Sequence, residues 1–327
     1  ESISGQINSE LVKPLSDKRL FLNIYSNNYE RYEFNGRFNK KISENLGTGI
    51  YVHGNLRNGT IDNNNDSFLD TPLAEQINLM NRWQYMDSEK GWVSFLTLHY
   101  LKDKKNTGQV NFVPERDKLT TNFWGSEVLS NRLDISSKVG YVFPELPYQS
   151  IGIQTSYNIH DQNSYYGLNQ YNIKQNSFYT NLIFNSIINN TQNKIKAGIN
   201  YSNDYYDEQV NGLGLGRNDN TIGSFFEYSY DSLERLSLVA GIRMDHHNKL
   251  GNFITPRFHI RYSLWDKASL RGSFGKGVKG ANIFAENQQF FASSRSLEII
   301  ENSGKIYGLN PEVAWNFGIS FIQKLYL

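Results

Sequence analysis

Residues 236–277, LSLVAGIRMDHHNKLGNFITPRFHIRYSLWDKASLRGSFGKG, contain three successive runs in which apolar and polar side chains alternate. One face of the first run carries Leu236, Leu238, Ala240, Ile242 and Met244, and the next two runs repeat the pattern. A period of two is the signature of a strand with one apolar and one polar face. The stretch therefore predicts three antiparallel strands. Their apolar faces meet either a protein core or, in a transmembrane barrel, lipid.

The composition limits the class of protein. Tyr and Phe are abundant (21 and 20) and Pro is scarce (7), which favours strands and aromatic girdles. The net charge of +1, with basic residues scattered among acidic ones, gives no reason to expect a nucleic-acid partner. The chain has no cysteine, so it can form neither disulfides nor thiolate metal sites. No apolar run approaches the roughly 18 residues of a membrane-spanning helix, so a membrane crossing has to use strands.

Short and long connections between the predicted strands alternate along the chain. Short polar turns are predicted near residues 43–45, 87–90, 144–148, 189–193, 231–235 and 265–267. Longer loops are predicted at residues 57–72, 102–121, 160–171, 204–220, 246–252 and 278–311, with helical periodicity only around residues 281–289. This alternation is typical of an up-and-down outer-membrane barrel with short periplasmic turns and long extracellular loops. It predicts an all-β, antiparallel transmembrane β-barrel of about fourteen strands, each roughly 10–15 residues long.

One face of each predicted strand is polar and would line the barrel interior. In three regions of the chain the alternation assigns to this face Gln76, Asn78, Arg82 and Gln84; Gln154, Ser156, Asn158 and His160; and Arg243, Arg257, Arg261 and Arg271. The four arginines suit either a path for an anionic ligand or charge pairing with interior carboxylates such as Asp245 and with a plug.

Several stretches together resemble TonB-dependent outer-membrane receptors, in particular those of Bacteroidota. The stretches that carry the resemblance are SISGQINSELVKP (2–14), DNNNDSFLDTP (62–72), QINLMNRWQY (76–85), GSFFEYSYD (223–231), LVAGIRMDHHNKLGNFITPRFHIRYSL (238–264), ANIFAENQQFFASSR (281–295) and YGLNPEVAWNFGISF (307–321). They occur in the same order as in the family and cover most of the chain.

The resemblance implies a domain organisation. Residues 1–14 would be the last strand of the family's plug domain and its junction with the barrel, and residues 15–327 would be the first part of the barrel. The family barrel has about 22 strands and is plugged. We therefore expect a chain truncated at its C-terminus, whose remaining plug and barrel strands lie in further sequence or in a second chain.

The resemblance also implies a function, which is TonB-dependent active uptake of a scarce nutrient across the outer membrane of a Gram-negative cell. The nutrient would be a metal chelate such as a siderophore, cobalamin, or an oligosaccharide. The expected partners are TonB with its inner-membrane energising complex, the ligand, outer-membrane lipid and a surface lipoprotein. No enzymatic activity is expected, because no nucleophile, base and orienting group can be assembled from the sequence.

An Asp/Asn-rich stretch is a candidate calcium site. Asp62, Asn64, Asp66 and Asp70 place oxygen ligands at alternating positions, as in a calcium loop. Position six is Ser67 rather than Gly, and position twelve is Leu73 rather than Glu, so the stretch is not an EF-hand. It fits either a structural Ca²⁺ site or a turn whose side chains cap their own backbone. No other cofactor is expected to be required.

Substrate-binding candidates come from the predicted loops and the polar face. The tyrosine pairs Tyr165–Tyr166 and Tyr205–Tyr206 are predicted on extracellular loops, where their rings could stack on a ligand or simply pack. His246 lies at the outer end of a strand beside His247, and adjacent strand residues cannot both face the interior. Arg257 and Arg261, on the polar face, are the remaining substrate-binding candidates.

Three alternative functions for the whole chain stay open. They are a passive outer-membrane channel, a structural or receptor subunit of a larger outer-membrane assembly, and a soluble carbohydrate-binding or glycosidase β protein.

Overall fold

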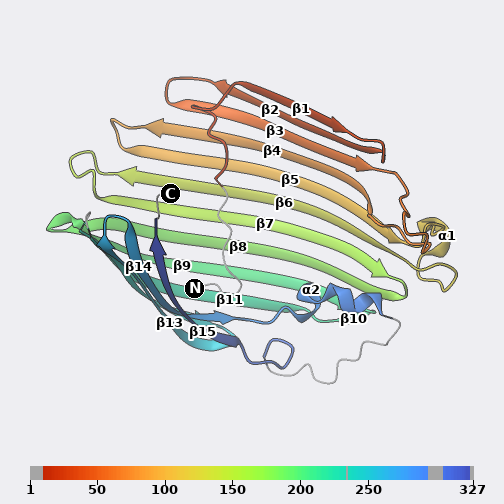
Figure 1. Cartoon of the computed structure of the whole chain (residues 1–327). Coiled ribbons are helices and arrows are strands. Elements are labelled where there is room, and N and C mark those ends of the chain that lie inside the picture. The colour runs from red at the N-terminus through yellow and green to blue at the C-terminus, as the bar shows by residue number, and fades with distance from the viewer. Residues whose placement is uncertain (1–9, 233–234, 294–304, 325–327) are drawn as a thin grey trace.

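The computed structural model describes residues 10–232, 235–293 and 305–324. These residues form one antiparallel sheet, in which fourteen long strands follow one another in chain order and the two-residue β10 pairs beside β9 (Figure 1). The predicted all-β architecture is confirmed. The strands are β1 (Leu20–Ser26), β2 (Arg31–Lys41), β3 (Leu46–Arg57), β4 (Leu73–Asp87), β5 (Trp92–Gly108), β6 (Gly125–Val142), β7 (Ser150–Tyr166), β8 (Asn169–Ile188), β9 (Asn190–Val210), β10 (Leu213–Gly214), β11 (Arg217–Asp231), β12 (Leu236–His247), β13 (Gly251–Trp265), β14 (Ala268–Lys279) and β15 (Glu312–Gln323).

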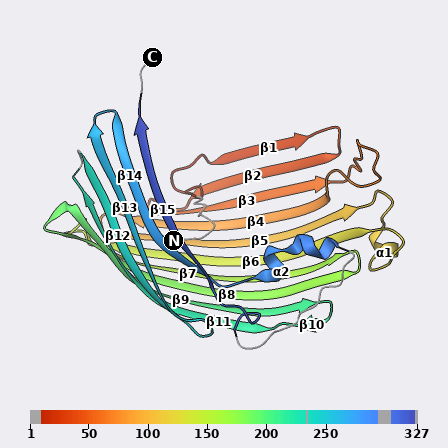
Figure 2. The ribbon, with the colours of Figure 1, turned by 60° about the horizontal axis from the view of Figure 1, so that its bottom comes forward.

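The sheet is curved into a trough (Figure 2), and β1 and β15 are its two edges in the described chain. Among the described residues, three short helical segments lie outside the sheet: α1 (Pro114–Asp117), α2 (Ile283–Glu286) and the 3₁₀ helix η1 (Gln288–Ala292). The last two confirm the helical periodicity expected around residues 281–289, and α2 lies on the concave side of the sheet. No helix among the described residues is long and apolar enough to span a membrane.

The two faces of the sheet have opposite polarity. On β15 the convex face carries Val313, Trp315, Phe317 and Phe321, all strongly exposed, and Ile319, which is 87% exposed. On β4 the concave face carries Arg82 and Gln84, which are buried, as the alternation predicts. A row of exposed apolar side chains is stable only against lipid or a second apolar surface. The inside of this sheet is therefore its polar, concave face.

The apolar part of the convex face has a limited height. On β7 it runs from Ile151 to Ile159 and ends at Asp161; on β9 it ends at Tyr201 and is followed by Asn203. About 9–11 residues of a tilted strand cross a bilayer, which matches this band. The β8–β9 hairpin continues for nine residues beyond Tyr201, to Val210. That continuation corresponds to roughly 30 Å of strand beyond the apolar band.

The predicted bounds of three loops are wrong. β5 and β6 are joined by residues 109–124 rather than 102–121, β7 and β8 by residues 167–168 rather than 160–171, and β9 and β11 by residues 211–216 rather than 204–220. Beyond the apolar band the outer face of these strands is largely polar, while the inner face carries Tyr166, Tyr171 and Tyr206. The sequence therefore loses the alternation that marks a strand even though the strand continues. The connections at 58–72 and 280–311 are long, as predicted. The connection at 248–250 lies within the predicted loop 246–252 but has only three residues.

The segment before β1 lies against the concave face. The Leu15 backbone N–H donates to the Gln84 amide oxygen at 3.2 Å, and the Asn39 side-chain amide donates to the Lys18 carbonyl at 2.9 Å. Gln84 and Asn39 are both buried residues of the inner face. Residues 1–9, and with them most of the predicted plug strand, lie outside the described residues.

Candidate functional site at the inner wall

An aromatic cluster forms where the connection between β14 and β15 meets the inner wall above the apolar band. The wall contributes the ends of β8 and β9 and the turn that follows β9, while α2, η1 and the residues before β15 cover them. The buried members are Tyr171, Ile173, Val210, Leu215, Phe284, Phe291, Ile306 and Tyr307, and Tyr166, Tyr206, Leu250 and Ile283 pack around them. This mouth cluster fixes part of the longest connection inside the mouth of the sheet.

Glu208 is the charged centre of the mouth cluster. Its side chain is 1% exposed, and its carboxylate accepts a hydrogen bond from the Tyr171 hydroxyl at 2.8 Å. The Tyr307 hydroxyl donates to its second oxygen, and the Arg217 guanidinium lies 3.4 Å from that oxygen. A carboxylate buried this deeply is tolerated only when it is paired and hydrogen-bonded. Glu208 therefore links β8, β11 and the connection 280–311.

Arg217 is the cationic partner in this network. Its guanidinium carbon lies 3.9 Å from the centre of the Tyr206 ring and 4.9 Å from that of Tyr307. Its nitrogens donate to Asp219 at 3.0 Å and also to Asn282, which precedes α2. A planar guanidinium can stack and make several directed hydrogen bonds at once, which a lysine cannot. Arg217 therefore joins the barrel wall to the start of α2.

The phenols of the mouth cluster remain protonated well above neutral pH. Burial raises the pKa of Tyr171, and the nearby Glu208 carboxylate raises it further. Burial and the hydrogen bond to Glu208 raise the pKa of Tyr307, and burial raises the pKa of Tyr206 to about 12. These tyrosines therefore act as neutral hydrogen-bond donors and apolar rings.

The predicted tyrosine pairs lie on strands, so their placement on loops is wrong. Tyr166 is on the inner face, stacks on Phe291 with ring centres 5.8 Å apart and donates to Gln288 at 2.9 Å. Tyr206 is also on the inner face, beneath Arg217. Tyr165 and Tyr205 face outward, because neighbouring strand residues point to opposite sides. The structure thus brings Tyr166 and Tyr206 to one cluster and leaves Tyr165 and Tyr205 outside it.

The predicted histidine and arginine candidates also divide between the faces. His246 faces outward, with its ring nitrogen 2.7 Å from the Asn252 side-chain oxygen. Arg257 and Arg261 face inward, as the alternation predicts. Arg257 forms an ion pair with Glu227, and Arg243 donates to Asp245 at 2.6 to 3.0 Å. The predicted pairing of interior arginines with carboxylates therefore holds for Arg243 and Arg257.

The Asp/Asn-rich stretch forms a compact turn in the connection between β3 and β4. The Asp62 carboxylate accepts from the backbone N–H groups of Asp66 and Ser67 at 3.1 and 3.0 Å. The Asp70 carboxylate accepts twice from Asn63, both at 2.9 Å, and the Asn64 amide donates to Asp66 at 2.9 Å. No group of three or more His, Cys, Asp or Glu side chains in the described chain is arranged to hold a metal. These contacts fit the self-capping turn, and calcium binding stays a prediction.

The network around Glu208 is not predicted from the sequence. Residues 204–220 look like a loop, and the run GLGLGR at 212–217 looks like its flexible tip. In the structure Leu215 is buried in the mouth cluster and Arg217 begins β11. Continuing the β9 alternation past Tyr201 would have placed Tyr206 and Glu208 on the inner face together.

Comparison with known proteins gives a family and a fold. The profile of the TonB dependent receptor-like β-barrel family matches residues 15–326. Curated protein sequences gave no significant match. Among solved structures, the siderophore receptor PirA from Pseudomonas aeruginosa is similar over 94% of this chain and 52% of its own, with 11% identity and a TM-score of 0.65.

Two further solved structures agree with this fold. FpvA from P. aeruginosa, in complex with a ferric pyoverdine, matches 92% of this chain and 45% of its own, with 10% identity and a TM-score of 0.68. The alcaligin outer-membrane receptor FauA from Bordetella pertussis matches 90% of this chain and 46% of its own, with 11% identity and a TM-score of 0.61. This chain spans about half the length of these structures. It belongs to the TonB-dependent receptor-like β-barrel family, in the outer membrane of Gram-negative cells, with the long connections 58–72, 109–124 and 280–311 at its extracellular end and the short turns of the opposite end periplasmic.

Proposed function

We propose that this chain forms the barrel wall of a receptor for TonB-dependent uptake of a scarce nutrient, with a metal chelate such as a ferric siderophore as the first candidate. The observation that carries the proposal is the family match over residues 15–326, because it covers the whole described sheet. The receptors for siderophores that share its fold support the choice of ligand class. Cobalamin and oligosaccharides are the other candidate ligands, and the role is transport rather than catalysis.

The proposed ligand path follows the concave face. Of the residues predicted to bind substrate, Tyr166, Tyr206, Arg257 and Arg261 belong to this face. The mouth cluster occupies the same face at the extracellular end and would shape the entrance. Tyr205 and His246 point away from the lumen and would contribute only from outside the wall. Tyr165 faces the same way but is buried against Phe112 and Lys118.

The complete receptor would contain more than this chain describes. We propose a plug that ends at residues 1–14, a barrel of about 22 strands, and TonB with its energising complex as the source of work. The resemblance to Bacteroidota receptors adds a surface lipoprotein as a further candidate partner. A Ca²⁺ ion held by Asp62, Asn64, Asp66 and Asp70 would order the connection between β3 and β4, after the self-capping contacts had rearranged.

Uptake by intact cells tests the proposal. Cells with and without the receptor gene are offered radiolabelled ferric siderophores, labelled cobalamin and labelled oligosaccharides, and accumulation is measured. We expect accumulation of one ligand class to require the receptor, TonB and the proton gradient. Receptor-dependent accumulation that persists without TonB and after addition of a protonophore would instead support a passive channel.

A further inference from the structure

Two interior arginines lie directly opposite one another near the periplasmic end of the inner wall. Arg261 on β13 pairs with Arg271 on β14 in the strand register. Residues paired in this way have Cβ atoms about 4.5–5.5 Å apart, and like charges at that separation destabilise a sheet. A sheet that keeps such a pair needs a compensating negative charge or strong hydration.

Two other arginines of the same part of the inner wall do have carboxylate partners. Arg243 is paired with Asp245, and Arg257 with Glu227. Within the described chain no carboxylate forms an ion pair with Arg261 or Arg271, although Asp245 and Glu227 belong to neighbouring strands of the same face. Arg261 and Arg271 thus lie opposite one another without a carboxylate partner among the described residues.

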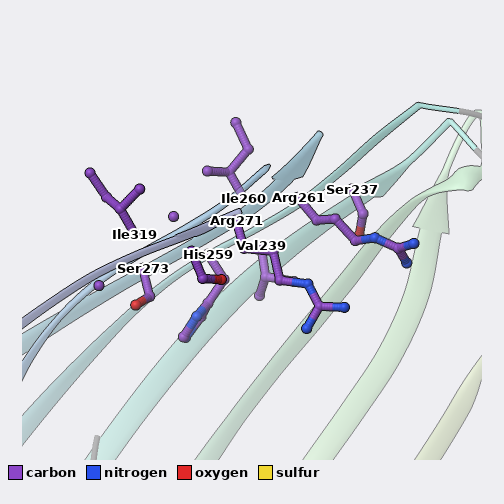
Figure 3. Close-up of a pocket in the computed structure, with 11 residues that line it drawn as sticks. Ser237, Val239, His259, Ile260, Arg261, Arg271, Ser273 and Ile319 are labelled. Atoms are coloured by element: carbon purple, nitrogen blue, oxygen red, sulfur yellow. The ribbon is translucent and has the colours of Figure 1, made fainter. Parts of the chain in front are cut away.

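Serine hydroxyls extend the arginine pair into a row across four strands. Ser237 on β12 pairs with Arg261, and Ser320 on β15 pairs with Arg271, so the row reads Ser237, Arg261, Arg271, Ser320. Figure 3 shows Arg261, Arg271, Ser237 and Ser273 directed to one side of the sheet, while Ile260 and Ile319 point to the other. The row therefore presents two guanidinium forks and two hydroxyls to the lumen.

The row borders a hollow in the wall. In the next row towards the extracellular side, Ser273 pairs with Gly318, and these small side chains leave room above the arginines. A second hollow on the periplasmic side shares Arg261 and Arg271 and is also lined by the charged residues Arg235, Asp266, Lys267 and Lys324. Cations thus predominate on the periplasmic side of the arginine pair.

We propose that the row Ser237, Arg261, Arg271 and Ser320 is a binding site for an oxyanion group, a phosphate or a carboxylate. A guanidinium matches two oxygens of such a group, and hydroxyls donate to the remaining ones. An oxyanion between the two arginines would also remove their mutual repulsion. The group comes either from a free anion in the lumen or from an acidic side chain of the receptor itself. The site goes beyond the proposed transport function and does not depend on it.

The test uses the receptor isolated from its native outer membrane. Inorganic phosphate is titrated into the wild type, into R261Q/R271Q and into K138Q/K194Q, and binding is followed by calorimetry. Lys138 and Lys194 are exposed cations of the same inner face, so the second variant removes the same charge elsewhere. For a free anion we expect saturable binding that R261Q/R271Q weakens at least about ten-fold and K138Q/K194Q does not. Arg271→Lys, which keeps the charge but loses the fork, should fall between them.

A thermal unfolding measurement distinguishes an acidic side chain of the receptor from a free anion as the source of the oxyanion. If a carboxylate of the receptor fills the site, the wild type binds no phosphate and R261Q/R271Q unfolds at a lower temperature than K138Q/K194Q. If the site takes a free anion, R261Q/R271Q without phosphate should be at least as stable as the control, because the arginine repulsion is gone. The absence of phosphate binding to the wild type, together with no loss of stability in R261Q/R271Q, would overturn the proposal. None of these measurements requires TonB, so they test the oxyanion site independently of the proposed uptake function.

Discussion

Tyr171 donates a hydrogen bond to Glu208 at 2.8 Å across the β8–β9 pair, and both side chains are almost fully buried. The two residues are diagonal neighbours, since Tyr171 pairs with Val210 and Glu208 with Ile173. Glu208 accepts a second hydroxyl from Tyr307, which is remote in sequence and precedes β15. One buried carboxylate thus ties the connection 280–311 to the wall that would guide a ligand into the barrel.

Replacing Glu208 with Gln should release this connection. The amide keeps one acceptor oxygen but loses the charge that strengthens the hydrogen bonds from Tyr171, Tyr307 and Arg217. Arg217 keeps its ion pair with Asp219, so we expect a cost of about 2–3 kcal/mol. Because amide exchange tracks the population of the open form, exchange of residues 281–292 should accelerate roughly 100-fold. Hydrogen–deuterium exchange read by mass spectrometry measures this rate. Glu75→Gln, at an exposed carboxylate, is the matched control. Unchanged exchange in Glu208→Gln would show that Glu208 does not hold the connection.

Two adjacent phenylalanines in η1 test the packing of the mouth cluster, because one is buried in it and the other is exposed. Phe291 is 1% exposed and packs against Tyr166, Tyr171 and Phe284, whereas Phe290 is 60% exposed. Phe291→Ala should therefore cost about 3–5 kcal/mol of packing energy in the mouth cluster, and Phe290→Ala little. Limited proteolysis and amide exchange of residues 281–292 should distinguish the two variants. Equal effects of the two substitutions would contradict the packing that the structure shows.

The sequence predicts the part of this wall that touches lipid better than the part above it. Between Ile151 and Ile159 apolar and polar residues alternate because one face meets lipid and the other water, so strand, face and register can all be read from the sequence. Beyond Asp161 the inner face packs against the mouth cluster, and the outer face carries polar residues and Tyr165, which packs against Phe112. The alternation therefore disappears, and the hairpin ends look like loops. The Glu208 network lies in that region, and its partner Tyr307 comes from a distant segment that no local pattern connects to it.

The pKa of Tyr206 makes the mouth cluster sensitive to alkaline pH. Burial raises this pKa to about 12 from the ordinary value near 10. The folded state therefore favours the protonated phenol, and its contribution to stability is complete below pH 10 and is lost as the pH rises towards about 12. The tyrosinate absorbance of the wild type minus that of Tyr206→Phe should give a single titration with its midpoint near 12. A midpoint near 10 would show that water reaches the Tyr206 hydroxyl.

Because one face of each strand meets lipid and the other meets the lumen, a lysine introduced on β7 should destabilise the receptor far more on the lipid-facing side than on the lumen-facing side. Ile153 on β7 faces outward within the apolar band, between Val139 and Leu182 on the flanking strands. A lysine near the bilayer midplane costs about 2–4 kcal/mol, so Ile153→Lys should destabilise the receptor by that amount. Ser156→Lys, three residues further along but on the inner face between Ser136 and Tyr179, should cost far less. Urea unfolding of the receptor in lipid vesicles, followed by tryptophan fluorescence, measures both variants. A larger loss of stability in Ser156→Lys than in Ile153→Lys would mean that the lipid-facing and lumen-facing sides have been exchanged.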